Sequence, residues 1–255
     1  MTDGPRRTPG AESGRRLLSA LLAFTPERPA PTVVELAETV QVPTSTAYRY
    51  LALLRETGLV EAIGDGTYRL TDRVTALSAA ASAARDDILE SATPRLRSLR
   101  DAIDETVLLA RRGGDFAYCI AREEASHPVR LQFAVGQAMP LHSGSVARVL
   151  LAAMPTGERL AYLRAHTSTT TPRNAALLTE AALAKVQMDG WTESYEEVDA
   201  GIWGVAAAIT RGVGGEVIAG LGTAGPLHRL DEDRRRLVTE KVRATAASMS
   251  ASLGV

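Results

Sequence analysis

The first seventy residues alternate short apolar stretches with polar segments rich in proline, glycine and threonine. Leucines at helical spacing follow Ser13, a residue type that caps helices well, and the proline-rich stretch 25–31 ends that helix. Two further segments have helical spacing, and two more have the pattern of strands around the turn Gly64-Asp65-Gly66. The predicted helices cover residues 13–22, 33–39 and 45–57, and the predicted strands cover 59–63 and 67–70.

An alanine-rich segment separates this region from a longer one of mixed pattern. Residues 74–84 have strong helix propensity and few large side chains, which favours a helix that links two domains. From about residue 86 helical and strand-like patterns alternate, which indicates a sheet with helices packed on it. Beyond the linker, the predicted strands cover 107–110, 116–121, 129–133, 191–195, 205–210 and 217–221, and the predicted helices cover 88–103, 144–153, 157–165, 180–188 and 231–253.

The second and third helices are joined by a three-residue turn, which is typical of a helix-turn-helix. The third helix would enter the major groove of double-stranded DNA by its N-terminus, and the following hairpin would be a wing. Small hydroxyl side chains and free N–H groups there can bind phosphates, while the next turn reaches base edges. The candidate DNA contacts are Thr44, Ser45, Thr46, Tyr48 and Arg49 on the third helix, Arg15 and Arg16 on the first, and Gly66 and Thr67 in the hairpin.

The charge balance does not by itself favour DNA. The whole chain has a formal net charge of −1. Residues 1–75 contain nine arginines and nine acidic residues, so this region has no net charge. A DNA-binding domain is more often basic, so the pattern alone leaves open a three-helix interaction module that does not bind DNA.

The residue content argues against a disulfide-bonded, metal-binding, secreted or membrane protein. Cys119 is the only cysteine, which rules out an internal disulfide and a cysteine metal cluster and fits a reducing cytoplasm. The four histidines lie apart without metal-ligand spacing, so no metal site and no cofactor is predicted. No apolar run is long enough for a signal peptide or a membrane span.

The sequence predicts no catalytic residues. Residues 142–145 place two serines beside a histidine, but they lack the G-x-S-x-G elbow of hydrolases, and no phosphate-binding glycine motif occurs. The alternative is an enzyme-like or scaffold domain fused to a helical interaction module without DNA recognition. Binding to a specific operator would separate the two hypotheses.

Several ordered motifs resemble the IclR family of transcriptional regulators. In the first domain they are Val42-Pro43-Thr44-Ser45-Thr46-Ala47-Tyr48-Arg49-Tyr50-Leu51, Gly58-Leu59-Val60 and Tyr68-Arg69-Leu70. In the second they are 104–110, 140–152, Gly190-Trp191, Glu196-Glu197, Gly201, 204–207 and Gly225-Pro226. The family often has lysine and histidine where this chain has Thr44 and Tyr48, so its operator sequence cannot be taken from relatives.

The resemblance implies an α+β chain with a winged helix-turn-helix, a linker helix and a GAF-like effector domain that has an antiparallel sheet and flanking helices. It further implies a homodimer or homotetramer that regulates transcription in response to a small organic effector, and we expect a repressor. The expected boundaries are 1–12 for a disordered arm, 13–71 for the DNA-binding domain, 72–85 for the linker helix and 86–255 for the effector domain.

The resemblance also places the effector. Its expected contacts are Ser143, Gly144, Ser145 and Val146 in one loop, with Tyr195, Gly204, Gly222 and Ala224 on strands. Three of these strand positions have no polar side chain, which would enlarge the cup and make it less polar. We therefore expect an effector larger than a three-carbon acid, such as an aromatic or branched acid or a related carbonyl compound. Its polar end would meet N–H groups near Ser145 and the Tyr195 hydroxyl. Phe133 and Trp203 either border the cup or belong to the core, where large aromatic side chains are found more often.

Overall fold

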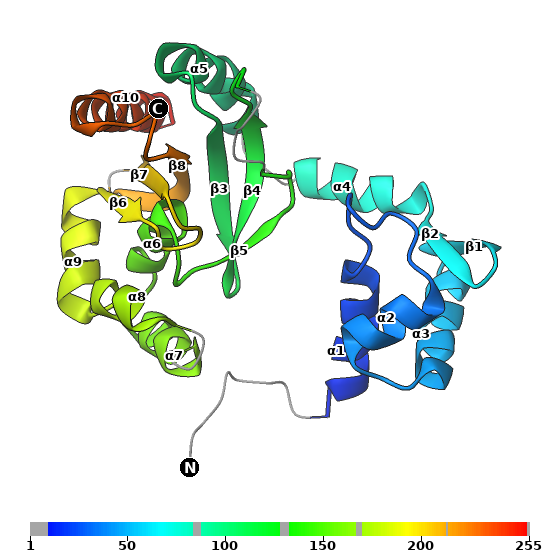
Figure 1. Cartoon of the computed structure of the whole chain (residues 1–255). Coiled ribbons are helices and arrows are strands. Elements are labelled where there is room, and N and C mark those ends of the chain that lie inside the picture. The colour runs from blue at the N-terminus through cyan, green and yellow to red at the C-terminus, as the bar shows by residue number, and fades with distance from the viewer. Residues whose placement is uncertain (1–9, 84–87, 128–132, 167–169, 213, 254–255) are drawn as a thin grey trace. The chain divides into compact units, whose positions relative to one another are not determined.

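The computed structural model describes residues 10–83, 88–127, 133–166, 170–212 and 214–253 (Figure 1). The chain divides into two compact units, with the boundary between Asp86 and Asp87. Most of the predicted arm lies outside the described residues, and so do residues 129–132 of the predicted strand 129–133.

The N-terminal unit has three helices, a hairpin and a further helix. Its elements are α1 (Glu12–Leu22), α2 (Val33–Val40), α3 (Thr44–Glu56), β1 (Val60–Gly64), β2 (Thr67–Leu70) and α4 (Arg73–Ala83). The strands pair antiparallel, with Val60 opposite Leu70. This order is that of a winged helix-turn-helix, as the sequence predicts.

Local chemistry fixes the start of α2. The Thr32 hydroxyl accepts the Glu35 backbone N–H at 3.3 Å, and the Glu35 carboxylate accepts the Thr32 backbone N–H at 2.7 Å. This reciprocal capping box satisfies two N–H groups that an isolated helix end would leave unpaired. The backbone hydrogen bond from Thr32 is the main cause that lowers the pKa of Glu35. The helix then packs Leu36 against Leu51 of α3, both almost fully buried.

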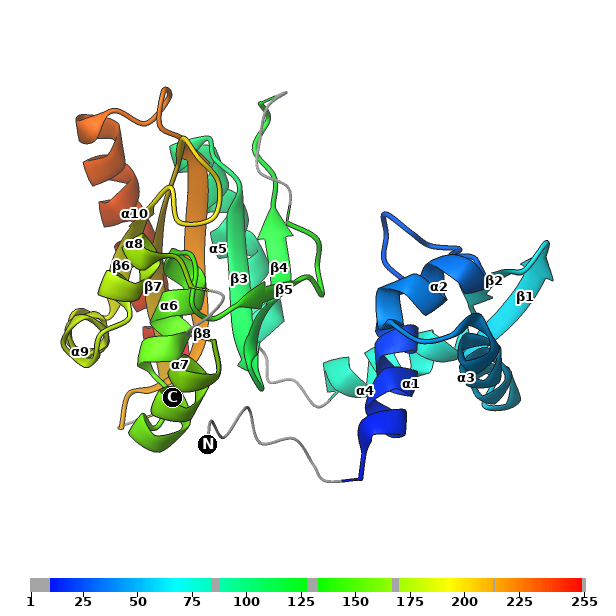
Figure 2. The same ribbon diagram turned by 60° about the horizontal axis from the view of Figure 1, so that its bottom comes forward.

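The C-terminal unit is one six-stranded antiparallel sheet with helices on both faces (Figure 2). The strand order is β5-β4-β3-β8-β7-β6, and every neighbouring pair is antiparallel. The strands are β3 (Val107–Gly113), β4 (Phe116–Glu123), β5 (Ala138–Pro140), β6 (Trp191–Tyr195), β7 (Ile202–Arg211) and β8 (Glu216–Pro226). The helices are α5 (Ile88–Ile103), α6 (Ser145–Ala152), α7 (Thr156–His166), α8 (Pro172–Leu177), α9 (Glu180–Asp189) and α10 (Glu232–Ser252).

Two apolar clusters lie on opposite faces of this sheet. Successive strand side chains point to opposite faces, so Leu109 and Leu221 pack with α5 and α10, while Leu108 and Ala206 pack with α6 and α9. The second cluster holds α6 against the centre of the sheet, where β8 contributes Gly220 and Gly222. The sheet with flanking helices matches the predicted fold class, whereas β5 and α8 were not predicted.

Candidate functional site

The recognition-helix candidate α3 has a buried face and an exposed face. Ala47, Tyr50, Leu51 and Leu54 are buried in the N-terminal unit. The predicted contacts Thr44, Ser45, Tyr48 and Arg49 are exposed, and Thr46 is half-buried. The Arg49 side chain makes no hydrogen bond or ion pair with any described residue, so its charge is available to a polyanion.

The other predicted DNA contacts have partners within the unit. Both Arg15 and Arg16 bind the Glu12 carboxylate, so part of their charge is neutralised before any phosphate is reached. The Gly66 carbonyl accepts the Val33 N–H at 2.9 Å, which ties the turn between β1 and β2 to the start of α2. Thr67 forms a backbone bridge with Thr32. These contacts fix the base of the wing beside the helix pair.

In the C-terminal unit, a glycine turn leads into α6. Gly144 adopts φ +86°, a conformation that other residues rarely adopt, and α6 begins at the next residue. The Gly144 N–H donates to the Glu197 carboxylate at 3.1 Å, and the Ser143 hydroxyl donates to the Glu197 carbonyl at 2.9 Å. The loop before α6 and the loop after β6 are therefore bound to each other.

A buried ion pair lies behind this junction. The Arg148 guanidinium, on the first turns of α6, binds the Glu197 carboxylate, and the two side chains are only 4% and 2% exposed. Arg148 also donates to the Thr192 hydroxyl at 3.0 Å and to the Glu193 carbonyl. A buried charge needs such partners because it has lost its water.

The His142 ring, directly before the glycine turn, packs on Tyr162. His142 Nδ1 lies 2.8 Å from the Tyr162 hydroxyl, and the His166 ring stacks on Tyr162 at 4.1 Å between centroids. Burial is the main cause that lowers the pKa of His142, and the neighbouring His166 adds to it. Burial raises the pKa of Tyr162 to about 12. His142 thus takes part in a structural hydrogen bond with Tyr162.

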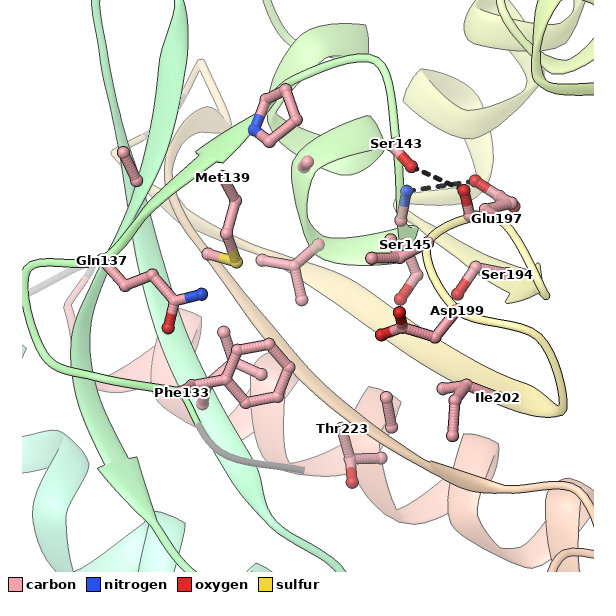
Figure 3. A pocket seen from close by; sticks show the side chains of 18 residues that line it. Phe133, Gln137, Met139, Ser143, Ser145, Ser194, Glu197, Asp199, Ile202 and Thr223 are labelled. Carbon is pink, nitrogen blue, oxygen red and sulfur yellow. Dashed lines mark hydrogen bonds between the residues drawn. The ribbon is translucent and has the colours of Figure 1, made fainter. Parts of the chain in front are cut away.

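A cavity of about 280 Å³ opens between the start of α6, the sheet and the loop after β6 (Figure 3). Its apolar wall includes Leu108, Phe133, Met139, Val146 and Ile202. Its polar groups come from Gln137, Ser143, Ser145, Ser194, Glu197, Asp199 and Thr223. Within the described chain, the backbone N–H groups of residues 145–147 have no hydrogen-bond acceptor. These N–H groups belong to the first turn of α6, where a helix attracts acceptors.

The cavity brings together five of the eight predicted effector contacts. Ser143, Gly144, Ser145, Val146 and Ala224 line it, and so does Phe133, which was expected either at the cup or in the core. Trp203 does not line it. This residue is fully buried in the opposite cluster with α5 and α10, because its side chain points to the other face of β7.

Tyr195 also lies on the other face of the sheet, and its predicted place in the cup is corrected. Its hydroxyl donates to the Glu193 carboxylate at 2.9 Å, and the Arg235 guanidinium of α10 lies 5.6 Å from its ring centroid. The neighbouring Ser194 lines the cavity instead. Alternation along β6 decides between the two residues, since adjacent side chains of a strand point to opposite faces.

Gly204 and Gly222 do not enlarge the cavity. This corrects the expectation that the missing side chains at these strand positions make the cup larger. A Cβ on Gly204 would lie 2.9 Å from Ser194 Oγ, and a Cβ on Gly222 would lie 2.3 Å from Val146 Cγ2. The space over each glycine is therefore filled by a neighbouring side chain. Gly204 leaves room for the Ser194 side chain of the neighbouring strand, and Gly222 allows Val146 of α6 to approach the sheet.

Comparisons with known proteins identify both units. The family model described as the IclR helix-turn-helix domain matches residues 15–64, and that of the bacterial transcriptional regulator IclR C-terminal domain matches residues 80–251. The chain is 31% identical to the HTH-type transcriptional regulator KipR of Bacillus subtilis over 92% of this chain and 94% of KipR. The chain belongs to the IclR family of transcriptional regulators.

Other IclR-family proteins resemble it over nearly the whole length. The HTH-type transcriptional repressor AllR of Escherichia coli strain K12 is 30% identical over 96% of this chain and 92% of AllR. A solved IclR homolog from Microbacterium hydrocarbonoxydans, complexed with 4-hydroxybenzoate, is 24% identical, has a TM-score of 0.72 and covers 94% and 98% of the two chains. That structure shows the same fold.

Membership of the IclR family decides the functional class. Its members are transcriptional regulators, so the winged helix-turn-helix is a DNA-binding unit and the chain is not an enzyme, as predicted. In the part of the chain that the structure describes, no helix is both long and apolar enough to cross a membrane.

Sequence reasoning missed most of the polar lining of the cavity. Gln137, Ser194, Glu197 and Asp199 all line it, and only Glu197 belongs to a motif used for the family resemblance. These residues lie in short loops and at a strand end, where no periodic signal marks the inward side. One sequence signal could have pointed to an acidic partner. Arg148 is a charged residue inside an otherwise apolar helix pattern, and a buried arginine is almost always paired.

Proposed function

We propose that this IclR-family chain is a repressor that acts in the cytoplasm as a homodimer or homotetramer, and that a small organic effector modulates its operator binding. The proposal that α3 binds operator DNA rests on the exposure of the N-terminal half of this helix. Tyr48 is 50% exposed there, and Arg49 has no partner among the described residues. Direct readout of bases needs such unoccupied side chains at the start of a recognition helix.

The DNA contacts are tested by an arginine pair on one helix. Arg49 lies in the first half of α3 and Arg55 in its last turn, and both are exposed. Arg49→Ala should weaken operator binding by about 1–3 kcal/mol, whereas Arg55→Ala should change it much less. Footprinting and gel shifts on the promoter region next to its own coding sequence measure both. Equal losses in the two variants would argue against the proposed docking.

The effector part rests on the cavity of the C-terminal unit. A volume of about 280 Å³ is close to the lower end for small-molecule sites and suits a single substituted ring. Phe133, Met139 and Val146 provide an apolar wall for the ring, and the N–H groups at the start of α6 can orient a polar substituent. The 4-hydroxybenzoate bound by the Microbacterium homolog supports a ligand of this size.

Occupancy of the cavity is tested with two methionines. Met139 lies in the cavity wall on β5, and Met188 is 80% exposed on α9. Met139→Trp should fill the cavity and abolish the effect of ring compounds on operator binding, while Met188→Trp should leave that effect unchanged. The comparison uses gel shifts with aromatic and branched alcohols, amines and acids, with pyruvate and glyoxylate as small controls. A response that survives Met139→Trp would refute this site.

A further inference from the structure

The charges around the cavity restrict the effector. Arg148 is the cation nearest in sequence to the loop before α6, but it is 3% exposed and does not line the cavity. Its guanidinium binds the Glu197 carboxylate, the Thr192 hydroxyl and the Glu193 carbonyl. Among the described residues that line the cavity there is no lysine, arginine or histidine. An effector carboxylate would therefore meet no free cationic side chain among these described residues.

One N–H group at the turn before α6 is already occupied, whereas those of residues 145–147 have no acceptor among the described residues. The Gly144 N–H donates to the Glu197 carboxylate, so an internal carboxylate takes this place at the turn. Displacement of Glu197 would be costly, because its backbone carbonyl also accepts hydrogen bonds from Ser143 and Asn174. Glu197 is thus held by both its side chain and its backbone, and it acts as a fixed part of the wall.

The second acid of the cavity has no such partner. Asp199 lines the cavity, and its carboxylate makes no hydrogen bond or ion pair with any described residue. Figure 3 shows its side chain directed into the cavity, on the side of Ser145 and Ser194. An ionised carboxylate only accepts hydrogen bonds. It therefore attracts a donor or a positive charge and repels an anion.

We propose that Asp199 selects the effector by charge. The effector is a ring compound whose polar end is a hydroxyl or an ammonium group that donates to Asp199, and it is not an acid. This inference rests on the proposed effector site and narrows the range of ligands given there. The alcohol and the amine share the required chemistry, since each offers a donor to a carboxylate.

The test uses three compounds with the same ring and different charge. Benzyl alcohol, benzylamine and benzoate are titrated into the full-length protein at pH 7.5 by calorimetry. We expect benzyl alcohol or benzylamine to bind at least tenfold more tightly than benzoate. Asp199→Asn should weaken benzylamine binding about tenfold, tighten benzoate binding and change benzyl alcohol binding least, because an amide still accepts a hydrogen bond.

A matched control removes an acid elsewhere on the same unit. Glu216, at the exposed start of β8, does not line the cavity, and Glu216→Gln should leave all three affinities unchanged. Benzoate binding that is as tight as that of the other two, and unaffected by Asp199→Asn, would overturn the charge selection and leave the effector site standing. Failure of all three compounds and of the wider panel to bind would instead overturn the proposed effector function, and this inference with it.

Discussion

Gly222→Ala tests the contact that closes the centre of the C-terminal unit. Gly222 of β8 faces Val146 of α6, and an added Cβ would lie 2.3 Å from Val146 Cγ2 and 2.9 Å from the Val205 carbonyl oxygen. Neither contact is tolerable without movement, and the second involves backbone that no rotamer change can relieve. We therefore expect the variant to fold with lower stability.

The expected magnitudes follow from packing. Overfilling a well-packed core typically costs about 1–3 kcal/mol, and the backbone contact places Gly222→Ala near the upper end of that range. Val146→Ala removes two methyl groups, worth about 0.8 kcal/mol each, and leaves a small cavity, so it should cost about 2 kcal/mol. In the double variant the smaller side chain relieves the clash, so the total loss should be about 2 kcal/mol below the sum of the single losses.

Urea denaturation followed by tryptophan fluorescence measures these losses of stability in the C-terminal unit, which contains the substitutions. The two tryptophans of the chain, Trp191 and Trp203, both lie in the C-terminal unit, so the signal reports its unfolding alone. Gly214→Ala is the control, because its Cβ would meet no atom within 4 Å and its φ is not in the left-handed range. Wild-type stability of Gly222→Ala, or simple additivity in the double variant, would refute the reasoning.

Three further predictions concern the same unit. Arg148→Met should lower the free energy of unfolding by about 3–5 kcal/mol, because Glu197 is left buried without its partner. Arg236→Met, in an exposed ion pair, should leave the free energy of unfolding nearly unchanged. Equal urea midpoints for the two variants would contradict this. Because burial lowers the pKa of His142, its neutral form is favoured in the folded state, and stability should fall as the pH drops below about 6.5. His142→Gln should reduce the fall in melting temperature between pH 7.5 and 5.5, and an unchanged fall would exclude His142 as its source. Residues 86–255 expressed alone should fold, remain oligomeric and unfold cooperatively, and a disordered or monomeric fragment by circular dichroism and light scattering would oppose the two-unit scheme.

Local signals were sufficient for most of the elements. Thr32 caps α2, and Asp231 caps α10 by accepting the Arg234 N–H at 2.8 Å. A residue that caps a helix acts on N–H groups two or three positions away, so the sequence alone reveals it. Short elements such as β5 and α8 were missed, because three to six residues contain too little periodicity to separate them from loops.

The sequence by itself determined the family, the two-unit order and the loop that leads into α6, because these depend on ordered motifs and on neighbours along the chain. Only the tertiary structure decided what lines the cavity. Ser194 lies there and Tyr195 does not, since one step along a strand reverses the side chain. The places of Gly222 against Val146 and of Asp199 in the cavity wall were decided in the same way, because the groups around them come from elements far apart in sequence. Contacts of that kind arise from packing, which no local pattern records.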